Sequence, residues 1–253
     1  MSPTPLTRAQ ARYVRQLKTK KYRLQEQAFL IEGKKSVHDL LTSHYKIKMV
    51  VTTPDFLQAE QAMLSGHPFP TFTAGPELLA QISSLKKNHQ VLAVAATQPN
   101  KPLTIKPGER ALALDTLQDP GNLGTMIRIA DWYGIKKLIC SPTTVDRYNT
   151  KVIQASMGSF TQVQTYYTPL APFLEATNAP VIGGVVQSKH YLHTTKLPPD
   201  GILVIGNESQ GIDPSLRPLL NVQVAIQPHG KVDSLNAAIA AAILCENWCS
   251  PVL

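Results

Sequence analysis

Asn122, Gly124 and Arg128 lie in a segment whose residue types fit an anion-binding loop. Residues 115–128 leave an apolar run, turn at a Pro-Gly pair and reach Gly124, where we expect a helix to begin. Free backbone N–H groups and the positive end of the helix dipole attract anions at such a position. Arg128, about one turn into the helix, is then expected to point toward the same mouth. A capped surface loop with a solvent-exposed arginine is the alternative.

A second loop, residues 205–213, ends an apolar run at Gly206, where the missing Cβ lets a ligand approach the backbone. Asn207 and Glu208 follow and supply an amide and a carboxylate, and Gly211 allows a second turn. Many surface turns share this composition. The loop therefore indicates a binding site only together with the other polar loops of the chain.

A third loop, residues 226–236, joins the last predicted strand to the last predicted helix. Ser234 is expected to cap that helix, and Asn236 to lie in its first turn. The helix is apolar almost all round, which predicts burial in a core or in a subunit interface. Cys245 and Cys249 are four residues apart on it, but without further ligands nearby we expect buried thiols and no metal.

The elements that position these loops are short apolar runs alternating with helical segments, which predicts a parallel α/β sheet covered on both faces. The strands are expected near residues 111–115, 137–140, 162–166, 181–186, 203–206 and 222–226, and the helices near 124–133, 150–157, 171–177, 214–219 and 234–248. In such sheets ligands bind beyond the carboxyl ends of the strands. The three polar loops start at such ends and are therefore the candidate ligand-binding loops.

The basic charge of the chain gathers at its N-terminus. Residues 1–50 hold 11 Lys and Arg against 3 Asp and Glu, whereas residues 51–253 hold 14 of each. On a helix this cluster attracts polyphosphate backbones, and it lacks the broad apolar face of a membrane-surface helix. A solvated helix face is the alternative. The candidate RNA-binding residues are Arg8, Arg12, Arg15, Lys18, Lys21 and Arg23.

A stretch rich in proline, residues 97–110, divides the chain and is expected to be a flexible linker. Residues 1–96 are expected to form a compact α/β domain, and residues 111–253 the second domain. In the first domain the strands are expected near residues 28–32, 48–52, 71–74 and 91–96, and the helices over the basic segment and near 34–43, 54–64 and 76–83.

Length and composition exclude several classes of protein. A hydrophobic fraction of 43% over 253 residues fits a globular protein of one large or two modest domains. The N-terminus shows no apolar signal-peptide core, and the longest apolar run, Ala237 to Cys245, is too short to span a bilayer. The three cysteines form no CxxC pattern. We therefore expect a cytoplasmic protein without membrane association.

Taken together and in this order, the three loops resemble the three motifs of the SpoU/TrmH group of SPOUT RNA methyltransferases. Each motif alone is unspecific, but three in register are a strong signal. The similar segments are Asn122-x-Gly124-x-x-x-Arg128, Gly206-Asn207-Glu208, Ser234-Leu235-Asn236 after Ile226, and Lys151 to Gly158 between the first two. This resemblance covers about residues 108–248. Residues 8–96 resemble the N-terminal RNA-binding domain of the group, which has the ribosomal L30e fold.

The resemblance implies a parallel α/β sheet with a deep C-terminal trefoil knot, preceded by a small L30e-like α/β domain. It also implies S-adenosylmethionine as the methyl donor, a homodimer formed through the last helix and the first helix of the knotted domain, and RNA as the partner. The implied reaction is methylation of a ribose 2′-hydroxyl, with rRNA preferred over tRNA. No metal is expected, because the methyl sulfonium is already an electrophile.

The resemblance further implies roles for single residues. Arg128 is the candidate for the chemistry, either as a general base or, since a guanidinium resists deprotonation, as the group that orients a phosphate and stabilises alkoxide charge. Gln154 stands where the group usually has Arg, which removes a cation. The implied catalytic residues are Arg128, Asn122, Glu208, Ser234 and Asn236, and the implied cofactor-binding residues are Gly206, Asn207, Ile226 and Leu235.

Two other functions compete with this one. The first is a non-catalytic RNA-binding relative of the same fold, which Gln154 favours and the intact Asn122, Arg128 and Asn236 disfavour. The second is a nucleotide-dependent oxidoreductase, which the missing GxGxxG pattern makes the weaker hypothesis. If RNA affinity resides in residues 1–96, a chain without them is expected to fold and bind S-adenosylmethionine but to methylate RNA poorly.

Overall fold

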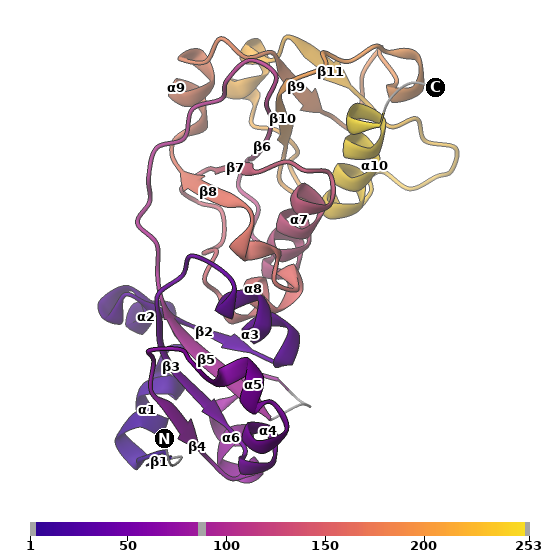
Figure 1. The fold of residues 1–253 in the computed structure, drawn as a ribbon. Helices are drawn as coiled ribbons and strands as arrows, with labels where there is room; N and C mark the ends of the chain where they lie inside the picture. Colours follow the sequence, from indigo (N-terminus) through magenta and orange to yellow (C-terminus); the bar gives the residue numbers. More distant parts are fainter. Residues whose placement is uncertain (1–3, 86–89, 251–253) are drawn as a thin grey trace. The chain divides into compact units, whose positions relative to one another are not determined.

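The computed structural model describes residues 4–85 and 90–250, and the chain divides into two compact units. Unit 1 consists of Met1–Pro99 and Asp146–Thr161, and unit 2 consists of Asn100–Val145 and Gln162–Leu253 (Figure 1). The chain therefore passes between the units three times. The sequence placed the boundary near residue 97 but did not predict the return of Asp146–Thr161 to unit 1.

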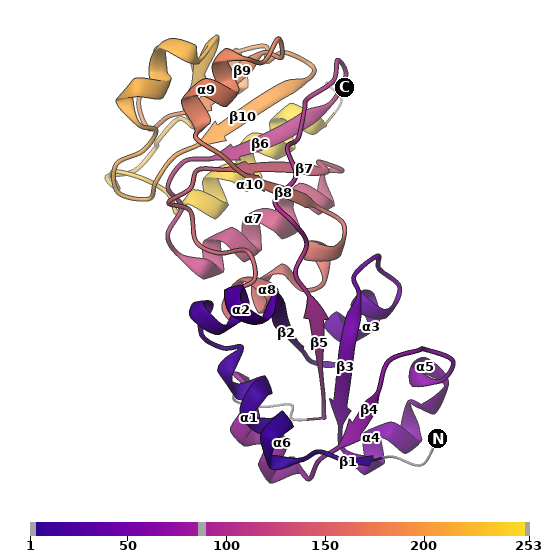
Figure 2. The ribbon, with the colours of Figure 1, turned by 90° about the vertical axis from the view of Figure 1, so that its left-hand side faces the viewer.

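Unit 1 is built on a five-stranded mixed sheet (Figure 2). The order is β1 (Thr4–Pro5), β4 (Thr71–Thr73), β3 (Ile47–Thr52), β5 (Val91–Ala96) and β2 (Ala28–Glu32). β5 is antiparallel to both of its neighbours, and the other two pairs are parallel. The predicted bounds of β2 and β5 are confirmed, because their apolar side chains are buried along almost the whole of both strands.

The helices of unit 1 are α1 (Arg8–Gln16), α2 (Lys20–Glu26), α3 (Lys34–Leu41), α4 (Pro54–Ala59), α5 (Gln61–Leu64), α6 (Pro76–Ile82) and α8 (Thr150–Ser156). The prediction of one continuous basic helix is wrong. α1 ends where Leu17 enters the core, and the guanidinium of Arg23 donates to the carbonyl oxygens of Leu17 and Lys18 at 3.0 and 2.9 Å. The end of α1 is therefore capped by a side chain of α2.

The segment Asp146–Thr161 packs in unit 1 because it carries apolar and charged partners for β2 and α2. Phe29 of β2 lies 4.5 Å from the ring of Tyr148 and 5.9 Å from that of Phe160, measured between centroids. Arg23 pairs with Asp146 at 2.7 Å. The predicted second domain of residues 111–253 therefore differs from the observed unit 2 in this segment.

Unit 2 has the predicted parallel sheet. Its six strands lie in the order β11 (Val222–Val224), β9 (Val181–Gly184), β10 (Gly201–Ile205), β6 (Arg110–Leu114), β7 (Lys137–Cys140) and β8 (Gln164–Tyr167), and every neighbouring pair is parallel. The central strands β6 and β10 are almost completely buried, which explains their continuous apolar sequences.

Unit 2 also contains α7 (Pro120–Trp132), α9 (Leu170–Glu175), α10 (Ala237–Cys249) and the 3₁₀ segments η2 (Leu192–Thr194) and η3 (Pro214–Leu219), and a further 3₁₀ turn, η1 (Ser159–Thr161), lies in unit 1. α9 and η3 bury leucines in the core of one sheet face, and α7 packs against α10. α7 begins four residues before the predicted position and α10 three residues after it. Both differences bear on the candidate site.

The segment between β9 and β10 lies against two later parts of the chain. The backbone of Ala225, directly after β11, bonds with that of His190 and Leu192, and Trp248 Nε1 of α10 donates to Pro198 O at 2.7 Å. A trefoil knot needs close passage of the C-terminal chain along this segment. The knotted threading itself stays a prediction of the family resemblance.

Residues 97–109 hold neither helix nor strand. The side chain of Asn100 donates to Tyr167 O at 2.8 Å and accepts from Tyr167 N at 2.9 Å, so the stretch is fastened to unit 2 directly after the boundary. Among the described residues, no helix has the length and apolar character needed to cross a bilayer.

Candidate active site

Three loops of unit 2 meet through the side chains of Asn122, Glu208 and Asn236. Asn122 Nδ2 donates to Glu208 Oε1 at 2.8 Å, and Asn236 Nδ2 donates to Asn122 Oδ1 at 3.0 Å. These residues follow β6, β10 and β11, so the network lies beyond the carboxyl ends of the strands. The structure brings together one residue from each of the three predicted loops.

The direction of this network follows from the helix cap at Asn236. Its Oδ1 accepts from the backbone N–H groups of Ala238 and Ile239 at 2.9 and 3.3 Å, so its NH₂ group is the one that faces Asn122. Asn122 must then present its oxygen to Asn236 and its NH₂ group to Glu208. Within the described part of the chain, Glu208 Oε2 has no hydrogen-bond partner, so one carboxylate oxygen is left for a donor.

The side chain of Asn207 is used within the protein. Its Nδ2 donates to Thr116 O at 2.8 Å, and its Oδ1 accepts from the N–H groups of Ser209 and Gln210 at 2.9 and 3.1 Å. These bonds fasten the loop after β10 to the loop after β6. Asn207 therefore positions Glu208, and the second N–H of its side-chain amide is left for the cofactor contact that the resemblance implies.

Gly206 is required by the loop itself. A Cβ at this position would lie 2.1 Å from Gly211 C and 2.2 Å from Ile212 N, because Asn207 and Gly211 pair through two backbone hydrogen bonds of 2.9 Å. The close approach of Gly211 is a reason for glycine at this position that the sequence did not reveal, and approach of a ligand to the Gly206 backbone stays a prediction. The missing Cβ admits the backbone of the same loop.

The N-terminus of α7 is capped by Asp119, whose Oδ1 accepts from Asn122 N at 2.8 Å. A carboxylate at this position satisfies the N–H group of Asn122 and places a negative charge at the helix start, which disfavours the binding of an anion there. The sequence contains a signal for this earlier helix start. In Asp119-Pro120-Gly121, Asp is a preferred N-cap residue and Pro is a preferred first helical residue.

Arg128 lies outside the hydrogen-bonded network. It is exposed, about 9 Å along the axis of α7 from Asn122, and it makes no hydrogen bond or ion pair with any described residue. Within a single chain the structure does not bring it to the mouth formed by the three loops. Because α7 begins four residues earlier than predicted, Arg128 lies about two turns from the start of the helix instead of about one.

The loop before α10 differs from the predicted one at its cap. Ser234 is exposed and outside the helix, and Asn236 holds the capping position that Ser234 was expected to hold. Leu235 keeps 43% of its surface exposed, and Ile226 is half-buried. The backbone N–H and C=O groups of Ile226 and Leu235 make no hydrogen bond among the described residues.

Thr116, which the sequence did not single out, joins the loops after β6 and β7. It has a left-handed backbone (φ +56°), which is costly for a β-branched residue. Its N–H donates to Ser141 Oγ at 2.8 Å, its hydroxyl donates to Asp115 Oδ1 at 3.1 Å, and its carbonyl accepts from Asn207. No sequence pattern marks a strained threonine in advance.

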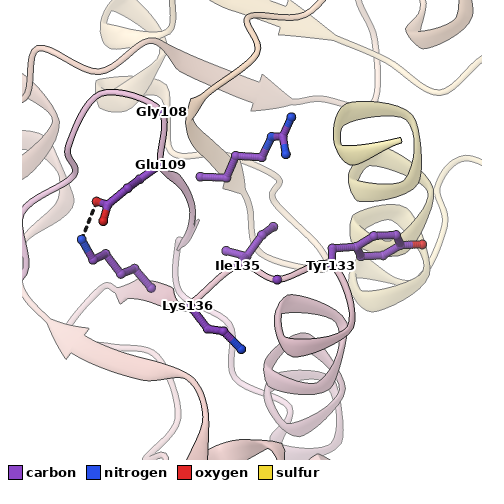
Figure 3. A pocket seen from close by; sticks show the side chains of 8 residues that line it. Gly108, Glu109, Tyr133, Ile135 and Lys136 are labelled. Atoms are coloured by element: carbon purple, nitrogen blue, oxygen red, sulfur yellow. Dashed lines mark hydrogen bonds and ion pairs between the residues drawn. The ribbon is translucent and has the colours of Figure 1, made fainter. Parts of the chain in front are cut away.

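A cavity of about 230 Å³ opens at the other edge of the sheet, where β6 and β7 begin (Figure 3). Its lining includes Glu109 and Lys137, which pair at 2.5 Å, and the Tyr133 to Lys137 turn. None of the candidate residues lines it, so its size does not identify it as the active site. The hydrogen-bonded candidate residues Asn122, Glu208 and Asn236 lie instead beyond the carboxyl ends of the strands.

The cysteines behave as packed thiols. Burial raises the pKa of Cys245, and its i,i+4 neighbour Cys249 is half-buried. Within the ranges that the structure describes, no three His, Cys, Asp or Glu side chains form a group that could hold a metal ion.

The candidate RNA-binding residues of unit 1 separate into two kinds. Arg8, Arg12 and Arg15 of α1 and Lys21 of α2 are exposed, whereas Lys18 is half-buried and donates to Ser83 O at 2.6 Å. Arg23 is only 3% exposed and is fully engaged with Asp146 and the end of α1. The prediction that Arg23 lies on an RNA-binding surface is wrong, since helix spacing alone does not distinguish a buried arginine from an exposed one.

Comparison with known proteins identifies both parts of the chain. Residues 109–246 match the SpoU rRNA Methylase family, and residues 8–93 match the MRM3-like substrate binding domain. The chain is 28% identical over 233 residues to the 23S rRNA (guanosine(2553)-2′-O)-methyltransferase RlmP of Bacillus subtilis, covering 91% of this chain and 92% of the relative.

Two solved structures resemble the whole chain. A putative RNA methyltransferase of the TrmH family from Porphyromonas gingivalis is 33% identical, with a TM-score of 0.86 over 96% of this chain and 98% of the other. An AdoMet-bound rRNA methyltransferase from Sinorhizobium meliloti is 26% identical, with a TM-score of 0.84 over 96% and 95%. The family match spans more than half of the sequence and includes all three loops of the Asn122–Glu208–Asn236 network. The chain belongs to the SpoU rRNA Methylase family.

Proposed function

We propose that the chain transfers the methyl group of S-adenosylmethionine to a ribose 2′-hydroxyl in rRNA. The observation that carries the proposal is the directed network from Asn236 through Asn122 to Glu208, which joins all three family motifs. The similarity to a 23S rRNA 2′-O-methyltransferase along nearly the full chain supports ribosomal RNA as the substrate.

The residues of the third loop fit S-adenosylmethionine. The unpaired backbone groups of Ile226 and Leu235 can bond with an adenine edge, and the exposed Leu235 side chain offers apolar surface to the ring. When bound, S-adenosylmethionine supplies a methyl group activated by its positive sulfur. The protein has to align the ribose oxygen with that carbon and accept one proton.

We assign these two tasks to the network. Glu208 Oε2 accepts the hydrogen bond of the ribose 2′-hydroxyl, and Asn122 holds the carboxylate in place through Oε1. With S-adenosylmethionine bound, the hydroxyl would pass its proton to Glu208 Oε2 as its oxygen bonds to the methyl carbon, and the electrons of the broken carbon–sulfur bond would stay on sulfur. We assign to Arg128 a substrate phosphate and the charge on the attacking oxygen; because it lies outside the network of its own chain, a second copy of the chain would supply it to the site. Ser234, exposed beside Asn236, contacts the same ribose.

Exposed apolar side chains near Arg128 indicate where a second copy of the chain could bind. Trp132 lies one turn after Arg128 on α7 and is 83% exposed, and Ile239 on the neighbouring α10 is 54% exposed. Exposed apolar patches mark interaction surfaces, and these two side chains lie on helices that pack against each other. We propose that a second copy covers them, which places Arg128 at the edge of the interface.

We assign RNA capture to unit 1. It holds 15 Lys and Arg against 7 Asp and Glu, so it carries the entire net charge of +8, and unit 2 is neutral. The match to a substrate-binding domain over residues 8–93 supports this division. Its exposed cations Arg8, Arg12, Arg15 and Lys21 are the phosphate contacts. The proposed location is the cytoplasm.

The test is methyl transfer by the purified protein. The full-length chain is incubated with S-adenosylmethionine and unmodified 23S rRNA, and nucleosides are analysed by mass spectrometry. A 2′-O-methylated nucleoside that depends on the protein is expected. Binding of S-adenosylmethionine and rRNA without turnover would identify a non-catalytic relative instead.

A further inference from the structure

His44 presents an aromatic ring to solvent in the turn between α3 and β3, which can be followed in Figure 2. The side chain is exposed and makes no hydrogen bond or ion pair with a described residue. We infer that His44 is a stacking platform for an unpaired RNA base. The inference rests on the proposed RNA substrate and adds a base contact to a unit so far assigned by its charge.

One face of the His44 ring is fixed against a rigid support. The ring stacks on Tyr45 with centroids 4.9 Å apart and planes at 29°. Tyr45 in turn packs edge-on against Phe29 at 5.5 Å and Phe160 at 5.6 Å. Because one face is covered and the side chain is exposed, the opposite face is available to a ligand.

Tyr45 cannot move easily out of this cluster. Its ring is packed edge-on between two aromatic rings, Phe29 and Phe160, and burial raises the pKa of its phenol above the usual range. A preorganised ring loses little conformational entropy when a base stacks on it. This separates His44 from an exposed histidine on a mobile loop.

The charge around the turn fits nucleic acid. Residues 42–52 contain Lys46 and Lys48 and no acidic residue. Lys46 is exposed, and its side chain has no partner among the described residues, so it can bind a phosphate next to the stacked base. Lys48 is anchored by donating to Glu26 O at 2.8 Å. Base stacking next to a cation is how single-stranded RNA is bound without sequence readout.

Unit 1 contains a matched control in His67. This exposed histidine stacks on Phe69 at 5.1 Å and 16°, so its ring geometry resembles that of His44. Residues 49–85 around it contain no Lys or Arg and three carboxylates, Asp55, Glu60 and Glu77. The same stack in acidic surroundings should not attract RNA.

The experiment measures the affinity of the full-length chain for a short single-stranded RNA and for a perfect duplex of equal length, by fluorescence anisotropy. His44→Ala should weaken binding of the single strand by about 5- to 100-fold and leave the duplex within about twofold. His44→Phe, which keeps a stacking ring, should stay close to wild type, and His67→Ala should change neither affinity. Melting midpoints of all variants serve to compare their folding.

Each outcome decides between the two proposals. Wild-type affinity in His44→Ala, equal losses in His44→Ala and His67→Ala, or a loss in His44→Phe as large as in His44→Ala would refute the platform while leaving methyl transfer standing. If the wild-type chain binds single strands through His44 but does not methylate rRNA, the platform stands and the proposed reaction fails. If the wild-type chain binds no RNA, both fail.

Discussion

At the scale of residues, the site depends on the direction of two hydrogen bonds. The cap at Asn236 fixes which atom of each amide faces the next, so that Asn122 presents its NH₂ group to Glu208. Because Asn122 donates to only one oxygen of Glu208, the other carboxylate oxygen stays free to accept a hydrogen bond. The orientation of these bonds depends on Asn236 capping α10.

Glu208→Gln tests this relay with a side chain of equal size. The Gln carbonyl still accepts from Asn122, but the free carboxylate oxygen becomes a donor. Methyl transfer should fall by about 10²- to 10⁴-fold, the usual contribution of a positioned base. The affinity for S-adenosylmethionine, measured by calorimetry, should stay within about threefold. Turnover close to wild type would remove Glu208 from the reaction.

Arg128→Ala should abolish methyl transfer and leave the affinity for S-adenosylmethionine within about tenfold, because Arg128 lies apart from the third loop. Arg128→Lys should recover little activity, since a lysine cannot provide the planar, bidentate contact to a phosphate. Single-turnover kinetics and calorimetry measure the two quantities. An Arg128→Ala enzyme with most of its turnover would contradict both roles considered for this residue.

At the scale of elements, the basic segment serves two purposes. α1 presents Arg8, Arg12 and Arg15 to solvent, while α2 turns Arg23 inward to Asp146. The arginines differ because the chain breaks between α1 and α2. At this break Leu17 enters the core, and Arg23 of α2 is directed into the protein while the arginines of α1 stay exposed.

Arg23→Met should therefore destabilise the fold, whereas Arg12→Met should not. Removing Arg23 takes the guanidinium away from Asp146 Oδ2 and from two carbonyls at the end of α1, whereas Asp146 Oδ1 keeps the N–H of Tyr148, so we expect a cost of about 1–3 kcal/mol. Arg12→Met should stay within about 0.5 kcal/mol of wild type. Denaturant unfolding of the two variants gives the comparison, and equal stabilities would show that the buried pair is replaceable.

Reversal of Arg12 and Arg15 to Glu should weaken RNA binding without unfolding α1. The slope of log affinity against log salt should decrease by roughly one unit for each RNA phosphate that the protein no longer neutralises. Reversal of two cations on unit 2, Lys189 and Lys196, is the matched control and should leave the slope nearly unchanged. The same slope in all three proteins would mean that α1 is only a solvated face.

At the scale of the whole molecule, the return of Asp146–Thr161 to unit 1 makes the two units interdependent. Tyr148, Val152 and Phe160 are buried, and the two aromatic residues pack on Phe29 of β2. The sequence predicts that a chain without residues 1–96 folds normally, whereas the packing of this segment leads us to expect the opposite. Such a chain would carry an uncovered apolar segment.

Deletion of residues 1–99 should give a protein that aggregates and binds a hydrophobic dye, because it exposes the partners of β2. Deletion of 1–99 combined with replacement of 146–161 by a flexible Gly-Ser linker should restore a soluble unit 2. Dye binding and size-exclusion chromatography distinguish the two. A monodisperse single deletion with native spectra would show that the segment is stable by itself.

The sequence predicted most strands because continuous apolar runs in buried strands are distinctive, as β2, β5 and β7 show. It placed Asn122, Glu208 and Asn236 in loops that meet, since family motifs and strand ends both pointed there. It could not predict that Gly206 is required by its own loop, that Asn207 fastens this loop to Thr116, or that Arg23 is buried. Those facts depend on contacts between distant residues, which periodicity does not record.

The three passages of the chain between units also constrain how the protein forms during translation. When Pro99 leaves the ribosome, every strand of the unit 1 sheet has been synthesised, but Tyr148, Phe160 and the partner of Arg23 have not. At 5–20 residues per second, Thr161 follows roughly 3–12 s later. During that interval the nascent chain displays an open aromatic surface around Phe29, where a chaperone can bind. The N-terminal unit therefore matures only after the first strands of the catalytic unit have been made.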